Sequence, residues 1–523
     1  MVSQEILKFC LENGLLIDQD ILNLFSNVND VEVVKLLLSK VKSYSNTRVI
    51  TRNFIEQNKS AFSKILHNLP EQNKIKKLKI ELGLKIEISE EVTSEINNSQ
   101  TFGGSVKVLS NFPFLNKKIE VKDFVNYFRN RFYDLSKILQ EHSELDNLIS
   151  INKISGEKRN FSLIGFVVDK RVTKNKNILL EIEDMSGKIR VLVSNVKKEL
   201  YEKADDLSLD SVLGFKVSGN REIVFANDII FPEAVLHERK LSHFNESVIF
   251  LGDIHFGSKR FLKKGFDKFL DYLNLKIGDR EEAKKIKYLF LVGDIVAGVG
   301  NYPNQERDLE ITDLEEQFVL FSELLKKVRS DIKIIISPGN HEGVRLMEPQ
   351  PMFDEKFAWP LYELKNVIIT PNPCSVNIGF NDSFSGFDVL TYHGFSFPFY
   401  ANNVSSLMLK RAMNSPEEIM KYLLKHRHLA PTHTSTQYYP SEKDGLVINK
   451  IPDVFVSAHT HKCGISYYNN ILVVSTSCWE AMTPYQEKFG NKPDHCKVPL
   501  FNLKTRQVKI LDFEDKEESE EKR

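Results

Sequence analysis

Five short apolar runs in the second half of the chain each end in a cluster of polar residues, and this pattern constrains the fold most. The runs are rich in Val, Ile, Leu and Phe, and Asp, Asn or His follows each of them within a few residues. Apolar runs of this length, bounded by turn residues, predict buried β-strands. The clusters are Asp253-Ile254-His255, Asp294, Asn340-His341-Glu342, His393 and His459-Thr460-His461.

The placement of these clusters predicts an open sheet with one functional edge. In open α/β sheets the carboxyl ends of the strands line a single crevice, so distant strand ends can bring their polar side chains together. Gly252, Gly293, Gly339 and Gly394 lie at or beside these ends, where they permit sharp turns and close backbone approach. Helical stretches alternate with the runs, so we expect residues 245–513 to form a layered α/β domain.

The polar set has the chemistry of a two-metal site. Imidazole and carboxylate groups suit Mn²⁺, Fe²⁺ or Zn²⁺, and the absence of Cys from the set disfavours a structural zinc site. Seven ligands with one bridging carboxylate can seat two ions about 3.5–4 Å apart, which clamp a phosphate and activate a water. One His would remain to protonate a leaving group. A lone His after a strand is more often a packing residue, but the complete ordered set favours a site.

Composition excludes several classes of protein. A length of 523 residues predicts two to four domains. Lys+Arg and Asp+Glu both number 71, so any affinity for nucleic acid must come from a local patch, a partner or bound metal. The five Cys show no CxxC spacing, which predicts reduced thiols. We find no signal-peptide pattern and no apolar run near the roughly 18 residues of a membrane span, and expect a cytoplasmic protein without membrane contact.

The first third of the chain predicts a helical domain, a linker and a connecting helix, in that order. Apolar residues recur at helical spacing within 1–75, and a partner-binding domain and a plain scaffold fit this pattern equally well. Residues 76–118 are lysine-rich, then acidic, then rich in Ser, Asn and Gly, which suits a flexible linker. A connecting helix is expected within 119–150, and the charged tail 514–523 is expected to be disordered.

Residues 151–240 contain about five short β-type runs separated by turn residues, which fits an OB-like barrel. OB folds often bind single strands through aromatic and basic side chains. A barrel that serves only as a protein-docking surface is the alternative, because the aromatic residues can equally form its core. The candidate contacts are Phe161, Phe166, Lys170, Arg171, Lys174 and Lys176.

The ordered set Asp-x-His, Gly-Asp, Gly-Asn-His-Glu, His-Gly and His-x-His resembles the calcineurin-like metallophosphoesterase superfamily over about residues 247–480. The resemblance implies two divalent metal ions, with Mn²⁺ expected first and Mg²⁺, Fe²⁺ or Zn²⁺ as alternatives. His341 would be the catalytic group, as proton donor or transition-state stabiliser. The first ion would be held by Asp253, His255, Asp294 and His461. The second would be held by Asp294, Asn340, His393 and His459, with Asp294 bridging.

The wider chain narrows this resemblance. A helical domain, a linker, an OB-like domain and then a phosphoesterase is the layout of B-type subunits of replicative DNA polymerases. Over about residues 120–512 the chain is similar to the small-subunit family of the archaeal family-D DNA polymerase. The stretches that carry this similarity are DFVNYFRNRF at 123–132, GVGNYPNQE at 298–306, GNHEGVRLMEPQP at 339–351, RHLAP at 427–431 and STSCWE at 475–480.

This family implies a metal-dependent 3′–5′ DNA exonuclease that proofreads for a large catalytic polymerase subunit. The implied partners are that large subunit, in a heterodimer or larger assembly, the single-stranded 3′ end of DNA and, as a further candidate, the sliding clamp. A nucleoid-associated location in the cytoplasm follows. Two alternatives stay open: a free-standing metallophosphoesterase or repair nuclease, and a non-catalytic scaffold subunit. The OB-like domain speaks against the first, and the complete ligand set against the second.

The chain departs from the family pattern beside the metal motifs. Ala458 stands where the superfamily usually has Gly, and Ala297 where an acidic residue is expected. After His393-Gly394 the family leads us to expect a basic and acidic continuation, but the chain has Phe395-Ser396-Phe397-Pro398. These changes concern substrate contacts. The candidate substrate-binding residues are Arg345, for which a structural ion pair is the alternative, Tyr302 and Gln305.

Overall fold

The computed structural model describes residues 2–27, 31–44, 49–51, 55, 104–110, 118–488 and 490–522. They belong to two compact units, an N-terminal one that includes Met1–Thr101 and a main one made of Phe102–Phe353 and Pro360–Arg523. Within these described ranges no helix has the length and apolar character needed to cross a membrane.

Among the described residues of the N-terminal unit, three helices pack around a small apolar core. They are α1 (Val2–Glu12), α2 (Gln19–Asn27) and α3 (Val31–Tyr44). The short strands β1 (Leu16–Ile17) and β2 (Val49–Ile50) pair in parallel. Ile6, Cys10, Phe25, Val34 and Leu37 are fully buried, as expected from their helical spacing. Residues 56–75 of the predicted helical domain, and 76–103 and 111–117 of the predicted linker, lie outside the described residues.

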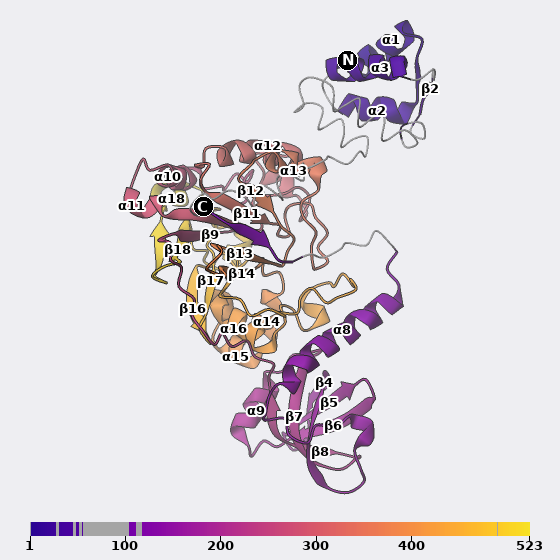
Figure 1. The fold of residues 1–523 in the computed structure, drawn as a ribbon, viewed down its shortest axis with the longest axis vertical. Coiled ribbons are helices and arrows are strands. Elements are labelled where there is room, and N and C mark those ends of the chain that lie inside the picture. The colour runs from indigo at the N-terminus through magenta and orange to yellow at the C-terminus, as the bar shows by residue number, and fades with distance from the viewer. Residues whose placement is uncertain are drawn as a thin grey trace. The chain divides into compact units, whose positions relative to one another are not determined.

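A closed five-stranded barrel occupies the segment for which the sequence predicts short strands (Figure 1). Its strand order is β4-β5-β6-β8-β7, and helix α9 (Lys198–Asp205) lies between β6 and β7 in sequence. A register shift between Val167 and Asp169 helps β4 to pair with β7 along its first half and with β5 along its second. The strands are β4 (Arg159–Val172), β5 (Ile178–Asp184), β6 (Gly187–Val193), β7 (Val212–Gly219) and β8 (Val224–Ile230).

Two of the proposed nucleic-acid contacts on this barrel are buried instead. Phe161 is 7% exposed and belongs to the barrel core. Phe166 is 8% exposed, and its ring packs against Phe128 and Phe132 of α8 (Val121–Gln140), the connecting helix. These two rings are therefore not available to stack on bases, and for them the alternative of a packing role holds. Phe161 lies inside the barrel and Phe166 lies under α8, and in both places the removal of apolar surface from water stabilises the fold.

The remaining part of the main unit has four layers, helices on either side of two stacked six-stranded sheets (Figure 1). The first sheet has the order β12-β11-β10-β9-β18-β19 and the second has the order β16-β17-β15-β14-β13-β3. The strands of the first are β9 (Ser247–Leu251), β10 (Ile286–Val292), β11 (Lys333–Ser337), β12 (Val367–Ile369), β18 (Lys497–Asn502) and β19 (Val508–Asp512). Those of the second are β3 (Val106–Val108), β13 (Cys374–Ile378), β14 (Phe387–Tyr392), β15 (Val454–Ser457), β16 (Gly464–Tyr468) and β17 (Ile471–Ser475).

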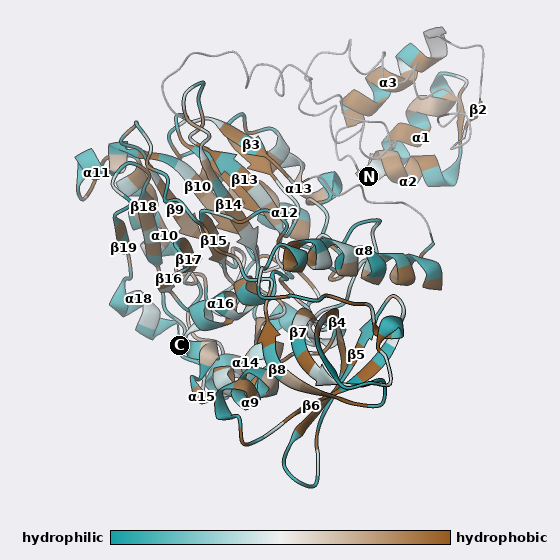
Figure 2. Ribbon diagram, turned by 60° about the horizontal axis from the view of Figure 1, so that its bottom comes forward, coloured by the Kyte–Doolittle hydropathy of each residue, from teal (hydrophilic) through white to brown (hydrophobic). Residues whose placement is uncertain are grey.

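Apolar residues from both sheets form one core between them, and Figure 2 shows these strands as predominantly hydrophobic. Phe250 and Phe290 of the first sheet and Val389 and Val456 of the second are fully buried there. The five predicted runs are the strands β9, β10, β11, β14 and β15. The helices of these layers are α10 (Lys263–Leu273), α11 (Arg280–Lys284), α12 (Leu314–Leu325), α14 (Phe397–Asn403), α15 (Ser405–Leu409), α16 (Pro416–His426), α17 (Pro484–Lys488) and α18 (Lys516–Glu521). Helix α13 (Glu355–Tyr362) begins in Asp354–Trp359, a segment grouped with the N-terminal unit, and ends in the main unit.

Two segments expected to lack regular structure have it. Within the predicted linker 76–118, β3 pairs antiparallel with β13 and extends the second sheet. The charged tail predicted to be disordered contains α18, in which Glu518 is 3% exposed. Its carboxylate accepts hydrogen bonds from the backbone amides of Lys264 and Gly265, which begin α10. The tail is thereby ordered because it satisfies amides that the helix itself leaves without partners.

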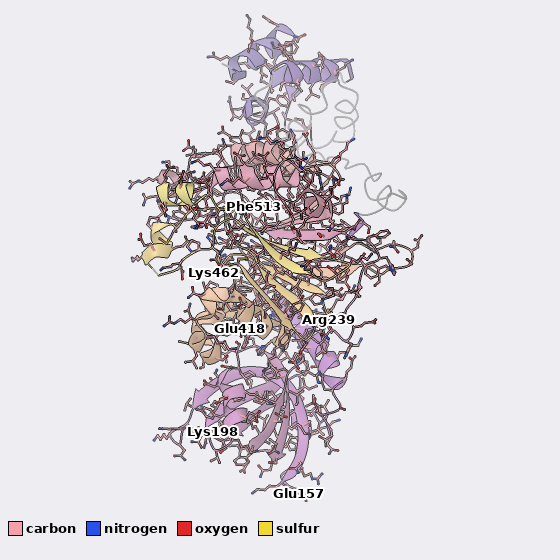
Figure 3. All side chains as sticks on the ribbon, turned by 90° about the vertical axis from the view of Figure 1, so that its left-hand side faces the viewer. Glu157, Lys198, Arg239, Glu418, Lys462 and Phe513 are labelled. Carbon is pink, nitrogen blue, oxygen red and sulfur yellow. The ribbon has the colours of Figure 1, made fainter. Side chains whose placement is uncertain are left out.

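The barrel and the two-sheet layers share an interface built from the loop that precedes β7 and the helices below the second sheet. The Tyr422 hydroxyl of α16 donates to the Asp206 carbonyl at 2.8 Å, and the Ser406 amide donates to the Asp206 carboxylate at 2.9 Å. Figure 3 shows the helix layer that carries Glu418 between the sheets and the barrel. The barrel is thus fixed to the outer helices rather than to the strand ends.

Arg131 of α8 lies at the centre of this junction and is fully buried. Its Nε donates to Asp444 at 2.6 Å and its Nη1 to the Pro431 carbonyl at 2.7 Å. His428 and Tyr127 also contact the Asp444 carboxylate, at 2.9 and 2.5 Å. The stretches 123–132 and 427–431, which carry part of the family resemblance, therefore meet at one buried ion pair.

We expect Arg131→Ala to destabilise the main unit by about 3–5 kcal/mol, because it leaves the buried Asp444 carboxylate without its cation. Chemical denaturation of the full chain measures the change. Arg129→Ala, an exposed arginine on the same helix, is the matched control and should lie within about 0.5 kcal/mol of wild type. Equal effects of the two substitutions would contradict this account of the junction.

Candidate metal centre

The polar clusters that follow the five strands converge at one edge of the two sheets. β9, β10 and β11 are mutually parallel neighbours in the first sheet, and β14 and β15 are parallel neighbours in the second. Loop backbones then join the ends, since the His255 amide donates to the Asp294 carbonyl at 2.9 Å and the Ala458 amide to the His393 carbonyl at 3.0 Å. Segments up to 206 positions apart are connected at the site itself, where the His459 amide donates to Asp253 at 2.8 Å.

Seven of the eight predicted site residues fall into three groups that could hold a metal ion, each with ligand atoms within 4.8 Å of one another. Asp294 and His255 each belong to two of these groups, and of the two only the carboxylate has two ligand atoms with which to bridge a pair of ions. The eighth residue, Asn340, lies beside them with its Oδ1 3.1 Å from Nε2 of His393. The groups are Asp253 with His255 and His461, His255 with Asp294 and His341, and Asp294 with His393 and His459.

The backbone at the site is strained, because five of these residues adopt a left-handed conformation. Such φ values are uncommon for residues other than glycine and cost of order 1–3 kcal/mol each, and they cluster at functional sites. The turn geometry therefore aims the side chains into the site at a cost to stability. The residues and their φ angles are Asp253 (50°), His255 (50°), Asp294 (49°), His459 (69°) and His461 (57°).

Backbone carbonyls orient two of the imidazoles. Nδ1 of His393 lies 3.0 Å from the Val292 carbonyl, and Nδ1 of His341 lies 2.7 Å from the Ala297 carbonyl. A carbonyl oxygen can only accept, so Nδ1 donates in both cases. Nε2 of each ring is then directed toward Asp294, at 3.3 Å for His393 and 3.8 Å for His341. Outer hydrogen bonds of this kind hold ligating histidines in one tautomer.

Charge in the site is unevenly distributed. Burial lowers the pKa of His255 and of His459 to about 3, and neighbouring imidazoles add to the effect. These rings are therefore neutral, which is the form that binds metals. Burial also lowers the pKa of His393, but the Asp294 carboxylate outweighs it and raises this pKa to about 10. Burial would raise the pKa of Asp294, yet His393 and His341 hold it well below its usual range.

Three residues not assigned a role from the sequence hold the ligand loops together. The Glu342 carboxylate is buried and accepts from the Ile295 amide at 2.5 Å and the Gly339 amide at 2.8 Å, which joins the second and third strand ends. Burial is the main cause that raises its pKa to about 7. The amide of Gln350 donates to the Gly339 carbonyl at 2.8 Å and accepts from Asn372 at 2.6 Å. Asn372 in turn accepts from the His393 amide at 2.9 Å.

Through these hydrogen bonds, Gln350 helps to hold the loops that carry the candidate ligands Asn340 and His393. Gln350→Ala should weaken Mn²⁺ binding by about 10–100-fold, as loss of outer-shell partners of metal ligands generally does. Isothermal titration of the full chain with Mn²⁺ measures the affinity. Gln507→Ala, in which an exposed glutamine is removed, should bind as wild type does. An unchanged affinity in Gln350→Ala would show that the ligand loops hold their positions without it.

The three predicted substrate contacts have different surroundings. The Arg345 guanidinium lies 3.7 Å above the Tyr439 ring and donates to the Pro349 carbonyl, so a ring and a carbonyl are its described partners. Tyr302 is 45% exposed and its hydroxyl donates to Asp308 at 3.1 Å. Gln305 does not line the site. It is 2% exposed, and its amide is bonded to backbone groups of its own loop.

Two histidines outside the site are deeply buried, in agreement with a packing role. Nδ1 of His426 lies 2.8 Å from the Tyr422 carbonyl, and burial lowers its pKa to about 3. His428 contacts Asp444 within the junction of α8, and burial lowers its pKa to about 4.

Comparison with known proteins places this architecture in a family. Residues 248–463 match the family model for the B subunits of DNA polymerases alpha and epsilon. The chain is 35% identical to a DNA polymerase II small subunit of Methanothermobacter thermautotrophicus over 398 residues, which are 75% of this chain and 80% of that protein. It is 36% identical to one of Pyrococcus furiosus over 406 residues, 76% of this chain and 64% of that protein. One of Halobacterium salinarum is 33% identical over 399 residues, 75% of each chain.

The matched region spans less than two thirds of the Pyrococcus protein. Among solved structures, an archaeal phosphodiesterase aligns over 51% of this chain and 98% of its own, with 14% identity and a TM-score of 0.25. The sequence relatives, the matching model and the strand-end site agree with the resemblance expected above. The chain belongs to the family of archaeal DNA polymerase small subunits, the B-type subunits of the family-D enzyme.

Proposed function

We propose that the chain is a two-metal 3′–5′ exonuclease that removes terminal nucleotides from DNA and proofreads for a large catalytic polymerase subunit. The observation that carries this proposal is the complete set of eight side chains gathered at the strand ends. A scaffold subunit with a vestigial site has no need to keep this set of imidazoles and carboxylates on strained backbone. The set therefore favours an active site.

The residues present fit two divalent ions. Oδ1 of the fully buried Asp253 has no hydrogen-bond partner among the residues that the structure describes. An unpaired buried carboxylate oxygen costs free energy that a cation would recover. The mixed nitrogen and oxygen donors fit Mn²⁺, which the family resemblance puts first, with Mg²⁺, Fe²⁺ or Zn²⁺ as alternatives. The first ion would be held by Asp253, His255, Asp294 and His461, and the second by Asp294, Asn340, His393 and His459.

Bound ions of this kind supply positive charge that stabilises a phosphodiester under attack, and they activate a water. The protein supplies the remaining chemistry. His341 is partly exposed at the rim, with Nδ1 anchored on the Ala297 carbonyl and Nε2 directed toward the bridging Asp294. A ring in this position can hold a proton at Nε2 and give it to the leaving 3′ oxygen. Asp294 remains ionised because His393 and His341 favour its charged form.

The barrel completes the proposed assembly. Its five strands form a closed barrel, and a helix lies between the third and fourth of them, which supports the OB-like assignment. Because Phe161 and Phe166 are buried, we assign the barrel to docking of the large subunit rather than to stacking on bases. DNA would then reach the metal centre as a single-stranded 3′ end held by the assembled complex, with the sliding clamp as a further candidate partner.

Titration of the full chain with Mn²⁺ by calorimetry tests the proposal against a scaffold role. We expect two ions per chain. The result that would overturn the proposal is an absence of binding in a chain whose fold is verified by circular dichroism. That outcome would make the subunit a scaffold with a vestigial site.

A further inference from the structure

Two aromatic rings pack against His459, a candidate ligand of the metal centre. The rings of His393 and His459 have centroids 5.0 Å apart, and the centroid of the Phe395 ring lies 5.6 Å from that of His459. His393 is fully buried, whereas His459 and Phe395 are both partly exposed. Phe395 is therefore a partly exposed aromatic ring that packs directly against a candidate ligand of the metal centre.

The chain around Phe395 is fixed on both sides. Gly394, at a φ of 109°, turns the backbone after the buried ligand His393. The Ser396 hydroxyl donates to the Leu429 carbonyl at 2.9 Å, and Phe397 is fully buried in the helix layer. Two fixed neighbours leave Phe395 little freedom to turn inward. Its partial exposure is therefore a property of the fold.

An aromatic ring at this position has two possible uses. It can support the His459 ring, or it can offer a face to the substrate. Aromatic rings bind nucleobases by stacking, and a stacked base contributes about 1–3 kcal/mol without sequence preference. The family pattern leads us to expect charged residues after His393-Gly394, which would contact phosphate. Phenylalanine cannot do so, but it can receive a base.

We propose that Phe395 is the stacking platform for the nucleobase of the nucleotide whose phosphate occupies the metal centre. The inference rests on the proposed exonuclease function, and it states how the site would recognise the nucleobase of its substrate. A base can stack on a protein ring only when it has left its own helix stack. Phe395 therefore favours unpaired terminal nucleotides, which are the ones a proofreading nuclease has to remove.

A binding measurement tests this without any turnover. Thymidine 5′-monophosphate and deoxyribose 5-phosphate carry the same phosphate and sugar, but only the first has a base. We expect the full chain with Mn²⁺ to bind thymidine 5′-monophosphate about tenfold more tightly by calorimetry. Phe395→Leu keeps apolar packing against His459 but removes the aromatic face, and should reduce this preference severalfold. Phe395→Tyr should retain it.

Phe399→Leu is the control, because this phenylalanine is also partly exposed but lies on α14 against Tyr400. It should keep the preference of wild type. Equal affinities of wild type for the two compounds, or a preference that survives in Phe395→Leu, would overturn the inference. If the chain hydrolyses DNA but Phe395→Leu leaves the preference for thymidine 5′-monophosphate unchanged, only the stacking role is refuted. The expected preference without any hydrolysis would refute the exonuclease function and leave the base site standing.

Discussion

Asp294→Asn should abolish the binding of both metal ions and reduce nuclease activity to below about a thousandth of wild type. The expected loss exceeds the 10–100-fold effect of removing an outer-shell partner, because this carboxylate is shared by two of the ligand groups. Asparagine keeps the size of the side chain and its contact with the His341 amide, but it removes the charge. Calorimetry with Mn²⁺ and a primer-degradation assay measure the two effects.

Asp331→Asn is the matched control for this substitution. Asp331 is a half-exposed partner of Lys287 at the surface, so its loss should change neither property. Retention of two ions by Asp294→Asn would contradict a bridging role. A fold that is lost in Asp294→Asn, as judged by circular dichroism, would assign the carboxylate to structure instead.

His341→Ala should lower the rate of nucleotide removal by about 10²–10⁴ while two Mn²⁺ ions still bind. The two effects separate because His341 is assigned to proton donation and not to either ion. Single-turnover kinetics on an oligonucleotide measures the rate, and calorimetry measures the ions. His237→Ala, which removes an exposed histidine, should have wild-type values. If His341→Ala keeps the wild-type rate, another group must be the proton donor. If the variant binds only one ion, His341 is a metal ligand instead.

The strands that carry the site could be predicted because their signals are local. Each of β9, β10, β11, β14 and β15 is a short apolar run followed within a few residues by polar residues, and neither property depends on the rest of the fold. Convergence of their ends follows from parallel pairing alone. The loop after β12 also supports the site, but its contribution is harder to find in the sequence. Asn372 follows β12 by three positions and contacts His393, but amide side chains are less distinctive than histidines.

The features that could not be predicted depend on distant partners. β3 has only three residues in a polar stretch, and pairing with β13 is what makes it a strand. The tail is charged enough to stay solvated, yet Glu518 is ordered by the amides at the start of α10. The sequence does not show whether Phe166 points into the barrel or outward, and its burial depends on α8, which packs against it. In each case burial against a remote element decides the outcome over local composition.

The support of the site also became clear only from the structure. Gly339 is needed because a Cβ there would lie 2.3 Å from Oδ1 of Asp294. Glu342 and Gln350 were visible as part of the family stretch 339–351, but their hydrogen bonds to the loop backbone were not. The sequence identifies ligands by their chemistry, whereas the residues that position ligands use ordinary hydrogen bonds.

Degradation of a primer with a mismatched 3′ end, by the complex of this chain with its large subunit, tests the central claim most directly. We predict that the wild-type complex removes the terminal nucleotide in Mn²⁺. We also predict that a chelator, or Asp294→Asn in this chain, stops the reaction. A primer that stays intact with the wild-type complex, or that is shortened equally well by the Asp294→Asn complex, would contradict the assignment of exonuclease activity to these strand ends.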